Sequence, residues 1–236
     1  MYKGKKISLV FPAFNEEENI GRAISDFRAL RVVDEIIVVD NNSKDKTSKI
    51  AVRKKAKVIK ENKQGYGFAL RRGLSEAKGD YIALCEPDGT FVAKDLLKLL
   101  ERMDNYDIVM GSRTNKKYIF YNANMGGLLR LGNIALAKVI QILYRPSCYI
   151  SDCGCTFRVI KKPIVAKLLP KFTVGGSHFL AEFLVIALLS RFNILEIPVR
   201  YRKRIGKSKI TGSLKKSIIV GFQMLKITLK YRVITG

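Results

Sequence analysis

The first half of the chain alternates two kinds of segment, and this alternation constrains the fold more than any other feature. Short runs rich in β-branched residues are separated by stretches of helix length. The runs lie at 7–13, 35–40, 56–61, 80–86 and 107–112. Such alternation is typical of right-handed βαβ units around a mostly parallel sheet. We therefore predict an α/β fold that binds its ligands at the carboxyl ends of the strands.

Two acids stand where the fourth of these runs ends, in the stretch LCEPDGTF. Glu86 and Asp88 are two residues apart, and Pro87 between them restricts the turn. Carboxylates on a rigid turn suit Mg²⁺ or Mn²⁺, which proteins usually hold with one or two carboxylates plus substrate phosphates. The alternative is a polar turn that only closes the strand.

Two further segments, a strand end and the start of a helix, carry candidate ligand contacts. Asp40 ends the apolar run EIIVVD, where an acid can bind a base or ribose, or can simply begin the next helix. Gly67 belongs to the sequence QGYGFA, whose glycines allow the backbone to approach a ligand closely. A single G-x-G pattern is weak evidence by itself, so both interpretations stay open.

The second half of the chain differs from the first. It contains an amphipathic stretch at 125–145, a nearly all-apolar helix at 179–190 and a basic amphipathic helix at 213–232. Five polar residues of the last helix share a 100° arc: Lys215, Lys216, Gln223, Lys226 and Lys230. Such a helix can lie on anionic lipid, or it can pack on the protein core with its lysines in water. We predict one domain over 1–236, with a nucleotide-sugar lobe at 1–112 and an acceptor lobe at 113–236.

The formal charge of +24, from 44 basic and 20 acidic residues, favours polyanionic partners. The basic residues are spread along the chain without a recognised nucleic-acid motif, which argues against a specific nucleic-acid-binding module. No run reaches about 18 uncharged apolar residues, and no signal-peptide pattern opens the chain. We expect a cytoplasmic protein that is peripheral to a membrane. Its four cysteines are predicted to be free thiols rather than a metal site.

Several segments together resemble a known family. FPAFNEEENI, VVDNNSKDKT, KQGYGFALRRG and CEPDGTF occur in the order and spacing of the family 2 glycosyltransferases, and EIPVRYRKRIGKSKI extends the match. The resemblance covers about residues 6–212 and is strongest to the branch of dolichyl-phosphate mannose synthase and the polyprenyl-phosphate glycosyltransferases. It implies a GT-A fold: a Rossmann-like sandwich with a mostly parallel central sheet and an amphipathic helical acceptor lobe.

The resemblance also implies roles for individual residues. Glu86 and Asp88 match the metal-binding Asp-x-Asp pair, and Asp88 is thereby also a catalytic residue. The residues expected to bind the nucleotide sugar are Pro12, Phe14, Glu16, Asp40, Gly67, Pro87, Arg204 and Lys209. The first metal acid is Glu rather than Asp, and Thr90 stands where the mannose synthases often have Gln. Both departures bear on the metal geometry and the donor sugar.

The predicted activity is a metal-dependent, inverting transfer of a hexose from a UDP- or GDP-linked sugar to a polyprenyl phosphate. A phosphate acceptor needs cations rather than a general base, and Arg113 and Arg130 are candidates for that role. The alternative is a saccharide or glycolipid hydroxyl acceptor, with Glu182 as base. Glu182 could instead belong to a structural ion pair, and His178 one turn earlier shares its helix face. A nucleotidyltransferase is a further alternative.

Overall fold

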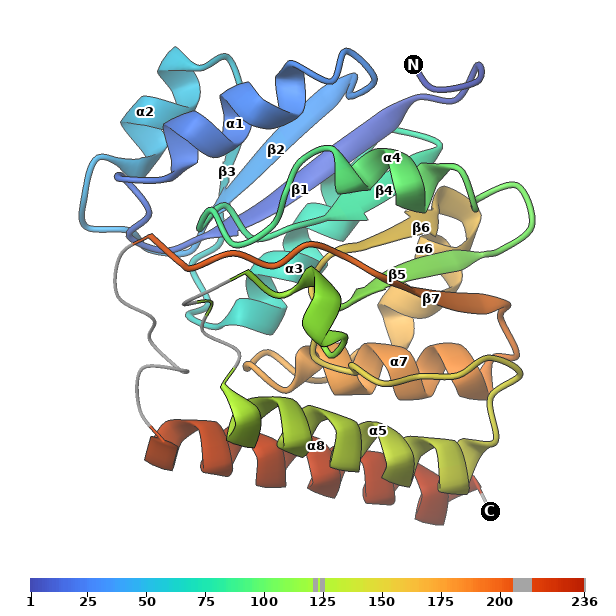
Figure 1. Ribbon diagram of the computed structural model, residues 1–236. Helices are drawn as coiled ribbons and strands as arrows, with labels where there is room; N and C mark the ends of the chain where they lie inside the picture. Colours follow the sequence, from blue (N-terminus) through green and yellow to red (C-terminus); the bar gives the residue numbers. More distant parts are fainter. Residues whose placement is uncertain (121–122, 124–125, 206–213, 236) are drawn as a thin grey trace.

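A computed structural model describes residues 1–120, 123, 126–205 and 214–235. Its centre is a seven-stranded sheet with the strand order β3-β2-β1-β4-β6-β5-β7 (Figure 1). The strands are β1 (Ile7–Ala13), β2 (Glu35–Asp40), β3 (Lys57–Lys60), β4 (Tyr81–Leu84), β5 (Ile108–Ser112), β6 (Arg158–Lys161) and β7 (Ile194–Pro198). All neighbours pair in parallel except β6, which runs antiparallel to both β4 and β5. The predicted mostly parallel α/β sheet is confirmed.

Helices cover both faces of this sheet. They are α1 (Ile20–Arg28), α2 (Thr47–Arg53), α3 (Tyr66–Glu76), α4 (Asp95–Leu100), α5 (Gly127–Tyr144), α6 (Lys162–Leu168), α7 (Phe179–Leu189) and α8 (Leu214–Thr235). Figure 1 shows α1, α2 and α4 on one face and α3, α6 and α7 on the other. Helices α5 and α8 lie side by side as a further layer beyond α7.

Burial on both faces explains why the strands read as continuous apolar runs rather than as an alternating pattern. In β1, Ile7, Leu9 and Phe11 join a core under α1 and α4, whereas Val10 joins the core under α3 and α7. Helix α7 is buried over most of its circumference because α3, α5, α6 and α8 all contact it. This accounts for its nearly all-apolar sequence.

The strand register places the candidate site. Ala13 pairs with Asp40, and Val10 pairs with Leu84, so β1, β2 and β4 end at the same edge of the sheet. The residues that follow these ends come together there. Strands β6 and β7 come from the second half of the chain, so the two predicted lobes share one sheet. Among the described helices, none is long and apolar enough to span a membrane.

Candidate functional site

A cavity of about 900 Å³ opens at the carboxyl ends of β1 and β4. One end is polar, and it is lined by strand-end residues and two arginines: Pro12, Ala13, Phe14, Glu16, Asn41, Glu86, Pro87, Asp88, Arg113 and Arg204. The other end is apolar and runs between α5, α7 and α8. Its lining includes Leu129, Leu136, Val139, Leu180, Ile218, Val220, Met224 and Leu225.

Asp88 is held by both of its carboxylate oxygens, and only 1% of the residue is exposed. Oδ1 accepts hydrogen bonds from the backbone N of Thr90 at 3.0 Å and from its Oγ1 at 2.6 Å. Oδ2 lies 3.1 Å from a terminal nitrogen of Arg204. Gly89 has φ +78°, a left-handed conformation that glycine adopts without strain, and it allows Thr90 to turn back onto Asp88.

Glu86 is fixed by two hydroxyl groups from other parts of the chain. The Tyr66 hydroxyl donates to its Oε1 at 3.0 Å, and Thr156 Oγ1 donates to the same oxygen at 3.2 Å. The two hydroxyls also lie within hydrogen-bond distance of each other, so the three oxygens share the two hydroxyl protons. Burial, and next the charge of Asp88, raise the pKa of Glu86 to about 7. A cation beside Glu86 would lower this pKa and favour the carboxylate form.

Arg204 joins the first strand end to the fourth. One terminal nitrogen lies 2.6 Å from Glu16 Oε1, and the other contacts Asp88. Glu16 also accepts a 2.9 Å hydrogen bond from Asn19. Burial opposes the charge of Arg204, but the carboxylates of Asp88, Glu16 and Glu86 outweigh it and raise its pKa above the ordinary value.

The donor set fits a divalent cation. Glu86 and Asp88 present hard oxygen ligands to the cavity, and the guanidinium of Arg204 already occupies the position of a cation beside Asp88. The described residues contain no group of three or more His, Cys, Asp or Glu that could hold a metal ion. The protein would thus supply few ligands and leave the rest to substrate oxygens and water, as is usual for Mg²⁺.

Other predicted donor contacts lie in different environments. Pro12, Phe14 and Pro87 line the cavity. Asp40 is buried behind it and accepts hydrogen bonds from Ser43 N at 2.9 Å and Ser48 Oγ at 2.5 Å. Neither contact is an N-cap bond, because α2 follows Lys46 as its N-cap residue and has no side-chain cap hydrogen bond. Lys209 lies outside the described residues.

Packing explains the glycine at position 67. A Cβ there would lie 2.7 Å from the carbonyl oxygen of Val174, so the close approach at Gly67 is to the protein's own backbone. Gly65, two residues earlier, does line the cavity. Its N–H donates at 2.8 Å to the side chain of Asn41, which also bonds to the carbonyls of Glu61 and Lys63.

The two arginines predicted to bind the acceptor phosphate differ in position. Arg113 lines the cavity and makes a two-pronged ion pair with Asp152, at 2.8 and 2.9 Å, while its guanidinium packs over the ring of Tyr201. Burial opposes the charge of Arg113, but Asp152 raises its pKa well above the usual value. Arg130 donates to the Thr114 carbonyl at 3.4 Å and is not among the residues that line the cavity.

Glu182 lies away from the cavity, fully buried in α7. Its carboxylate accepts hydrogen bonds from Thr173 N at 3.0 Å, Thr173 Oγ1 at 2.6 Å, Val174 N at 2.9 Å and the Tyr231 hydroxyl at 3.0 Å. It therefore connects the segment before α7 to α8. This geometry favours a structural role, although through hydrogen bonds rather than the ion pair considered above.

His178 is the N-cap residue of α7, and it also does not line the cavity. Its Nδ1 is buried without a hydrogen-bond partner, and burial lowers its pKa. The four cysteines are free, as predicted, and Cys85, Cys153 and Cys155 are fully buried. Burial raises the pKa values of the Cys153 and Cys155 thiols to about 12. These residues add no metal ligand to the cavity.

Sequence reasoning missed the residues that orient the acids and arginines. Tyr66, Thr156 and Asp152 carry no local pattern that marks them as partners of the site, and only the tertiary fold brings them to it, whereas Thr90 belongs to the same turn as Asp88. The nearest signal for Thr156 and Asp152 was the polar stretch DCGCT before β6. Buried Arg158, in the same region, bonds the carbonyls of Cys153 and Cys155 rather than facing the cavity.

Comparison with known proteins identifies relatives that match the chain over nearly its whole length. The family model described as glycosyl transferase family 2 matches residues 8–169. The chain is 28% identical over 235 residues to a dolichyl-phosphate hexose transferase of Haloferax volcanii, covering 98% of this chain and 97% of that protein. It is 30% identical over 226 residues to an uncharacterized glycosyltransferase of Mycobacterium bovis, covering 95% and 98% respectively.

Solved structures support the same fold. A glucosyl-3-phosphoglycerate synthase from Mycobacterium tuberculosis, in complex with Mn²⁺, UDP and glucosyl-3-phosphoglycerate, superposes with a TM-score of 0.72 at 20% identity. The match covers 97% of this chain and 80% of that one. The same synthase in complex with phosphoglyceric acid gives a TM-score of 0.73 at 21% identity, over 96% of this chain and 80% of that one.

Proposed function

This chain belongs to glycosyl transferase family 2 and has its GT-A fold, and on that premise we propose that it transfers a hexose from a nucleoside-diphosphate sugar to a polyprenyl phosphate. One observation carries the proposal. A single cavity joins the acidic strand ends at Glu86 and Asp88 to an apolar groove between α5 and α8. A donor with a charged diphosphate and an acceptor with a charged head and apolar tail match these two ends.

At the polar end, Glu86 and Asp88 would hold Mg²⁺ or Mn²⁺. When bound, the ion would neutralise the charge that develops on the departing nucleoside diphosphate. Thr90 fixes the orientation of Asp88, and Tyr66 and Thr156 fix Glu86, so the carboxylates need little reorganisation during the reaction. Arg204 contributes a second positive charge beside them. The Mn²⁺ and UDP complexes of the mycobacterial synthase support this assignment for a related fold.

At the same polar end of the cavity, Arg113 is the candidate ligand for the acceptor phosphate. Asp152 fixes two of its donor groups and holds the guanidinium in place. A phosphate monoester is already an anion at neutral pH, so it can attack the sugar carbon without a general base. Attack from the side opposite the nucleoside diphosphate gives inversion at that carbon.

At the apolar end, side chains of α5 and α8 offer a surface for the first isoprene units of the lipid. The Haloferax relative is named a dolichyl-phosphate hexose transferase, which is consistent with an acceptor of this kind. The hydroxyl-acceptor alternative requires a base near the donor. Glu182, its candidate, is buried away from the cavity with its oxygens already hydrogen-bonded, so the geometry gives that alternative no support.

We place the enzyme at the cytoplasmic face of a membrane as a peripheral protein. Helices α5 and α8 carry exposed apolar side chains, among them Leu131, Ile142, Ile218, Phe222 and Leu229, and two of these, Ile218 and Phe222, also line the cavity. Lys215, Lys226 and Lys230 are exposed beside them on α8. Exposed apolar residues next to lysines are the usual features of a helix that lies on anionic lipid.

The test is a transfer assay with UDP- and GDP-hexoses, Mn²⁺ and a short polyprenyl phosphate. We expect a hexosyl phosphoryl lipid whose sugar is released by mild acid, together with one nucleoside diphosphate per turnover. An acid-stable product formed on a hydroxyl acceptor, or release of pyrophosphate, would overturn the proposed acceptor or reaction.

A further inference from the structure

Three carboxyl groups line the polar end of the cavity, and the two that are almost fully buried need a compensating cation. Asp88 is 1% exposed and Glu16 is 8% exposed, and Glu86 lies beside them. Buried anions without a partner are strongly destabilising, so a protein without its metal must neutralise them in another way. In this fold, the neutralising charge comes from Arg204, which is distant from both acids in the sequence.

Arg204 supplies the positive charge. It bridges Glu16 and Asp88 at 2.6 and 3.1 Å, and its side chain is only 19% exposed. Because Thr90 occupies Oδ1 of Asp88, the guanidinium takes the oxygen that remains for a cation. A divalent ion at that oxygen would meet the like charge of Arg204 at close range, and the two cations would repel each other.

The third donor group of Arg204 has no acceptor. Its Nε is buried and makes no hydrogen bond, which is an unfavourable arrangement for a charged donor. A guanidinium forms its strongest pairs with the oxygens of phosphates and carboxylates, through two parallel hydrogen bonds. A diphosphate in the cavity could thus satisfy Nε together with a terminal nitrogen that has left Asp88.

The backbone beside Arg204 is anchored independently of its side chain. Ile205 N donates to the Asp88 carbonyl at 3.1 Å, and the Ile205 carbonyl accepts from Asn19 at 3.0 Å. Two residues before Arg204, Arg202 N donates to the Thr90 carbonyl at 2.7 Å. A change of partner by Arg204 therefore requires rotation of the side chain and no displacement of this segment.

From these contacts we infer that Arg204 is a placeholder cation, that is, a side chain that occupies the metal position until the metal binds. The inference rests on the proposed donor and metal site. In the metal-free enzyme it occupies Asp88, and it transfers to the donor diphosphate when the divalent ion takes its place. The site consequently binds the metal weakly by itself and strongly together with a nucleoside diphosphate. By reciprocity, the nucleotide gains the same factor from the metal.

The experiment measures Mn²⁺ affinity by electron paramagnetic resonance, with and without UDP or GDP. In Arg204→Gln we expect Mn²⁺ alone to bind about tenfold more tightly than in the wild type, because the competing charge is gone. The nucleoside diphosphate should bind about tenfold more weakly at saturating Mn²⁺, because its guanidinium partner is lost. The coupling between the two ligands should fall accordingly.

The matched control is Arg22→Gln, which removes the same charge from a side chain that is 67% exposed on α1. It should leave both affinities unchanged. If the Gln variant cannot be purified, Arg204→Lys replaces it; a lysine can pair with only one of the two acids, so we expect Mn²⁺ to bind about threefold more tightly.

Two outcomes would contradict the inference, and they are distinguishable. If a folded Arg204 variant binds Mn²⁺ alone no more tightly than the wild type, while the wild type binds Mn²⁺ and nucleotide together, the placeholder role is wrong and the proposed function stands. If the wild type binds neither UDP nor GDP with Mn²⁺, the donor site itself is wrong and the inference fails with it.

Discussion

The substitution Asp88→Asn removes the negative charge of this side chain while keeping its shape. Asn keeps an acceptor oxygen for the two Thr90 bonds but lacks the negative charge that faces the cation position. We expect Asp88→Asn to fold normally and to lose about 10²- to 10³-fold in transfer rate at saturating donor and Mn²⁺. Thermal melts and initial rates measure the two effects. The control is Asp26→Asn, whose carboxylate is 55% exposed. Full turnover of Asp88→Asn in chelator-treated buffer would contradict the assignment.

Removing the hydroxyl of Tyr66 tests whether the orientation of Glu86 affects metal affinity. Tyr66→Phe removes one of the two hydroxyl donors to Glu86 while keeping the ring in the core. Loss of an outer hydrogen bond to a metal ligand typically lowers metal affinity by about tenfold or more. We expect this loss in Mn²⁺ titrations in the presence of a nucleoside diphosphate, and no change in Tyr149→Phe, where the ring is exposed. Equal affinities for both variants would show that Glu86 does not depend on Tyr66.

The sequence separation between contacting residues determines which site contacts could be predicted from the sequence. Glu86 and Asp88 lie in one turn at a strand end, so a local pattern was enough to find them. The partner of Arg204 lies 188 residues away at Glu16, and Thr156 lies 70 residues from Glu86. Such pairs depend on strand order and side-chain packing. For Glu182 the sequence indicated a residue of interest but not its role. An acid in an apolar helix predicts a buried polar contact, and the sequence does not show whether that contact is catalytic or structural.

Between elements, the pair of Asp95 and Arg200 fixes the start of the segment that carries Arg204. Asp95 in α4 accepts from Arg200 N at 2.7 Å and from its guanidinium at 2.9 Å. Burial raises the pKa of Asp95, but the hydrogen bonds from Arg200 and Lys98 outweigh it and lower the pKa below 3.8. The stabilisation is therefore present above about pH 4 and is lost as the pH falls through the lowered pKa.

Asp95→Asn should then lower the free energy of unfolding by about 2 kcal/mol at pH 7. This is less than for a fully buried pair because Arg200 is partly exposed. The difference from the wild type should shrink as the pH falls through the lowered pKa of Asp95 and its carboxyl becomes neutral. Urea denaturation at several pH values measures it, with the exposed Asp104→Asn as control. A difference that does not depend on pH would mean that the ion pair is not its source.

Glu182 makes a prediction about how α7 and α8 are held together. In Glu182→Gln, the new amide NH₂ group would face donors that now bond to a carboxylate oxygen. We expect a lower melting temperature, and a transfer rate per folded molecule within about threefold of the wild type, because the residue does not line the cavity. A 10²-fold rate loss with an unchanged melting temperature would instead support Glu182 as a base.

The elements themselves were more predictable than their assembly. Hydrophobic periodicity gave helices at 125–145 and 213–232, close to the observed α5 and α8. The same pattern could not distinguish a helix that faces lipid from one that faces the core. In the structure, α8 has a buried side with Met224 and Ile227 and an exposed side with Ile218 and Phe222. The cavity between α5 and α8 depends on their side-by-side packing, which no single helix encodes.

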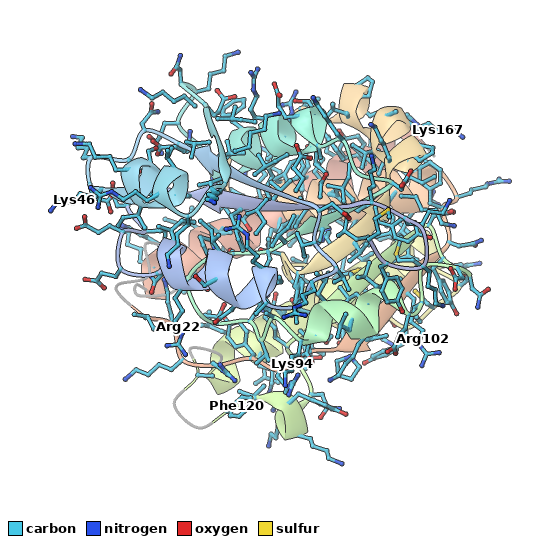
Figure 2. The ribbon with its side chains drawn as sticks, turned by 90° about the horizontal axis from the view of Figure 1, so that it is seen from above. Arg22, Lys46, Lys94, Arg102, Phe120 and Lys167 are labelled. Carbon is cyan, nitrogen blue, oxygen red and sulfur yellow. The ribbon has the colours of Figure 1, made fainter. Side chains whose placement is uncertain are left out.

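Over the whole molecule, the net charge of +24 is distributed rather than gathered in one groove. Figure 2 shows labelled basic side chains, among them Arg22, Lys46, Arg102 and Lys167, pointing outward from different elements around the periphery. A general attraction to anionic surfaces is the expected result of this arrangement. The proposed orientation on a membrane requires a feature confined to one face, and the exposed apolar side chains of α5 and α8 are the candidate.

Flotation with lipid vesicles separates the two contributions. Replacing Ile218, Phe222 and Leu229 by Ser should abolish most binding to vesicles with or without anionic lipid, because it removes the inserted apolar surface. Replacing Lys215, Lys226 and Lys230 by Glu should abolish only the extra binding to anionic vesicles, since each basic residue near the surface adds about 1 kcal/mol. The matched charge control is Lys44, Lys46 and Lys49 to Glu, on the opposite side of the sheet around α2 (Figure 1).

The control changes the total charge by the same amount as the variant in α8. If membrane binding is oriented by α5 and α8, the control should retain most of its flotation on anionic vesicles, while the α8 variant should float as if the vesicles were neutral. Equal losses in both would mean that net charge alone drives binding. In that case the apolar face of α5 and α8 would need an occupant other than lipid, and delivery of the acceptor to the cavity from the bilayer would lose its support.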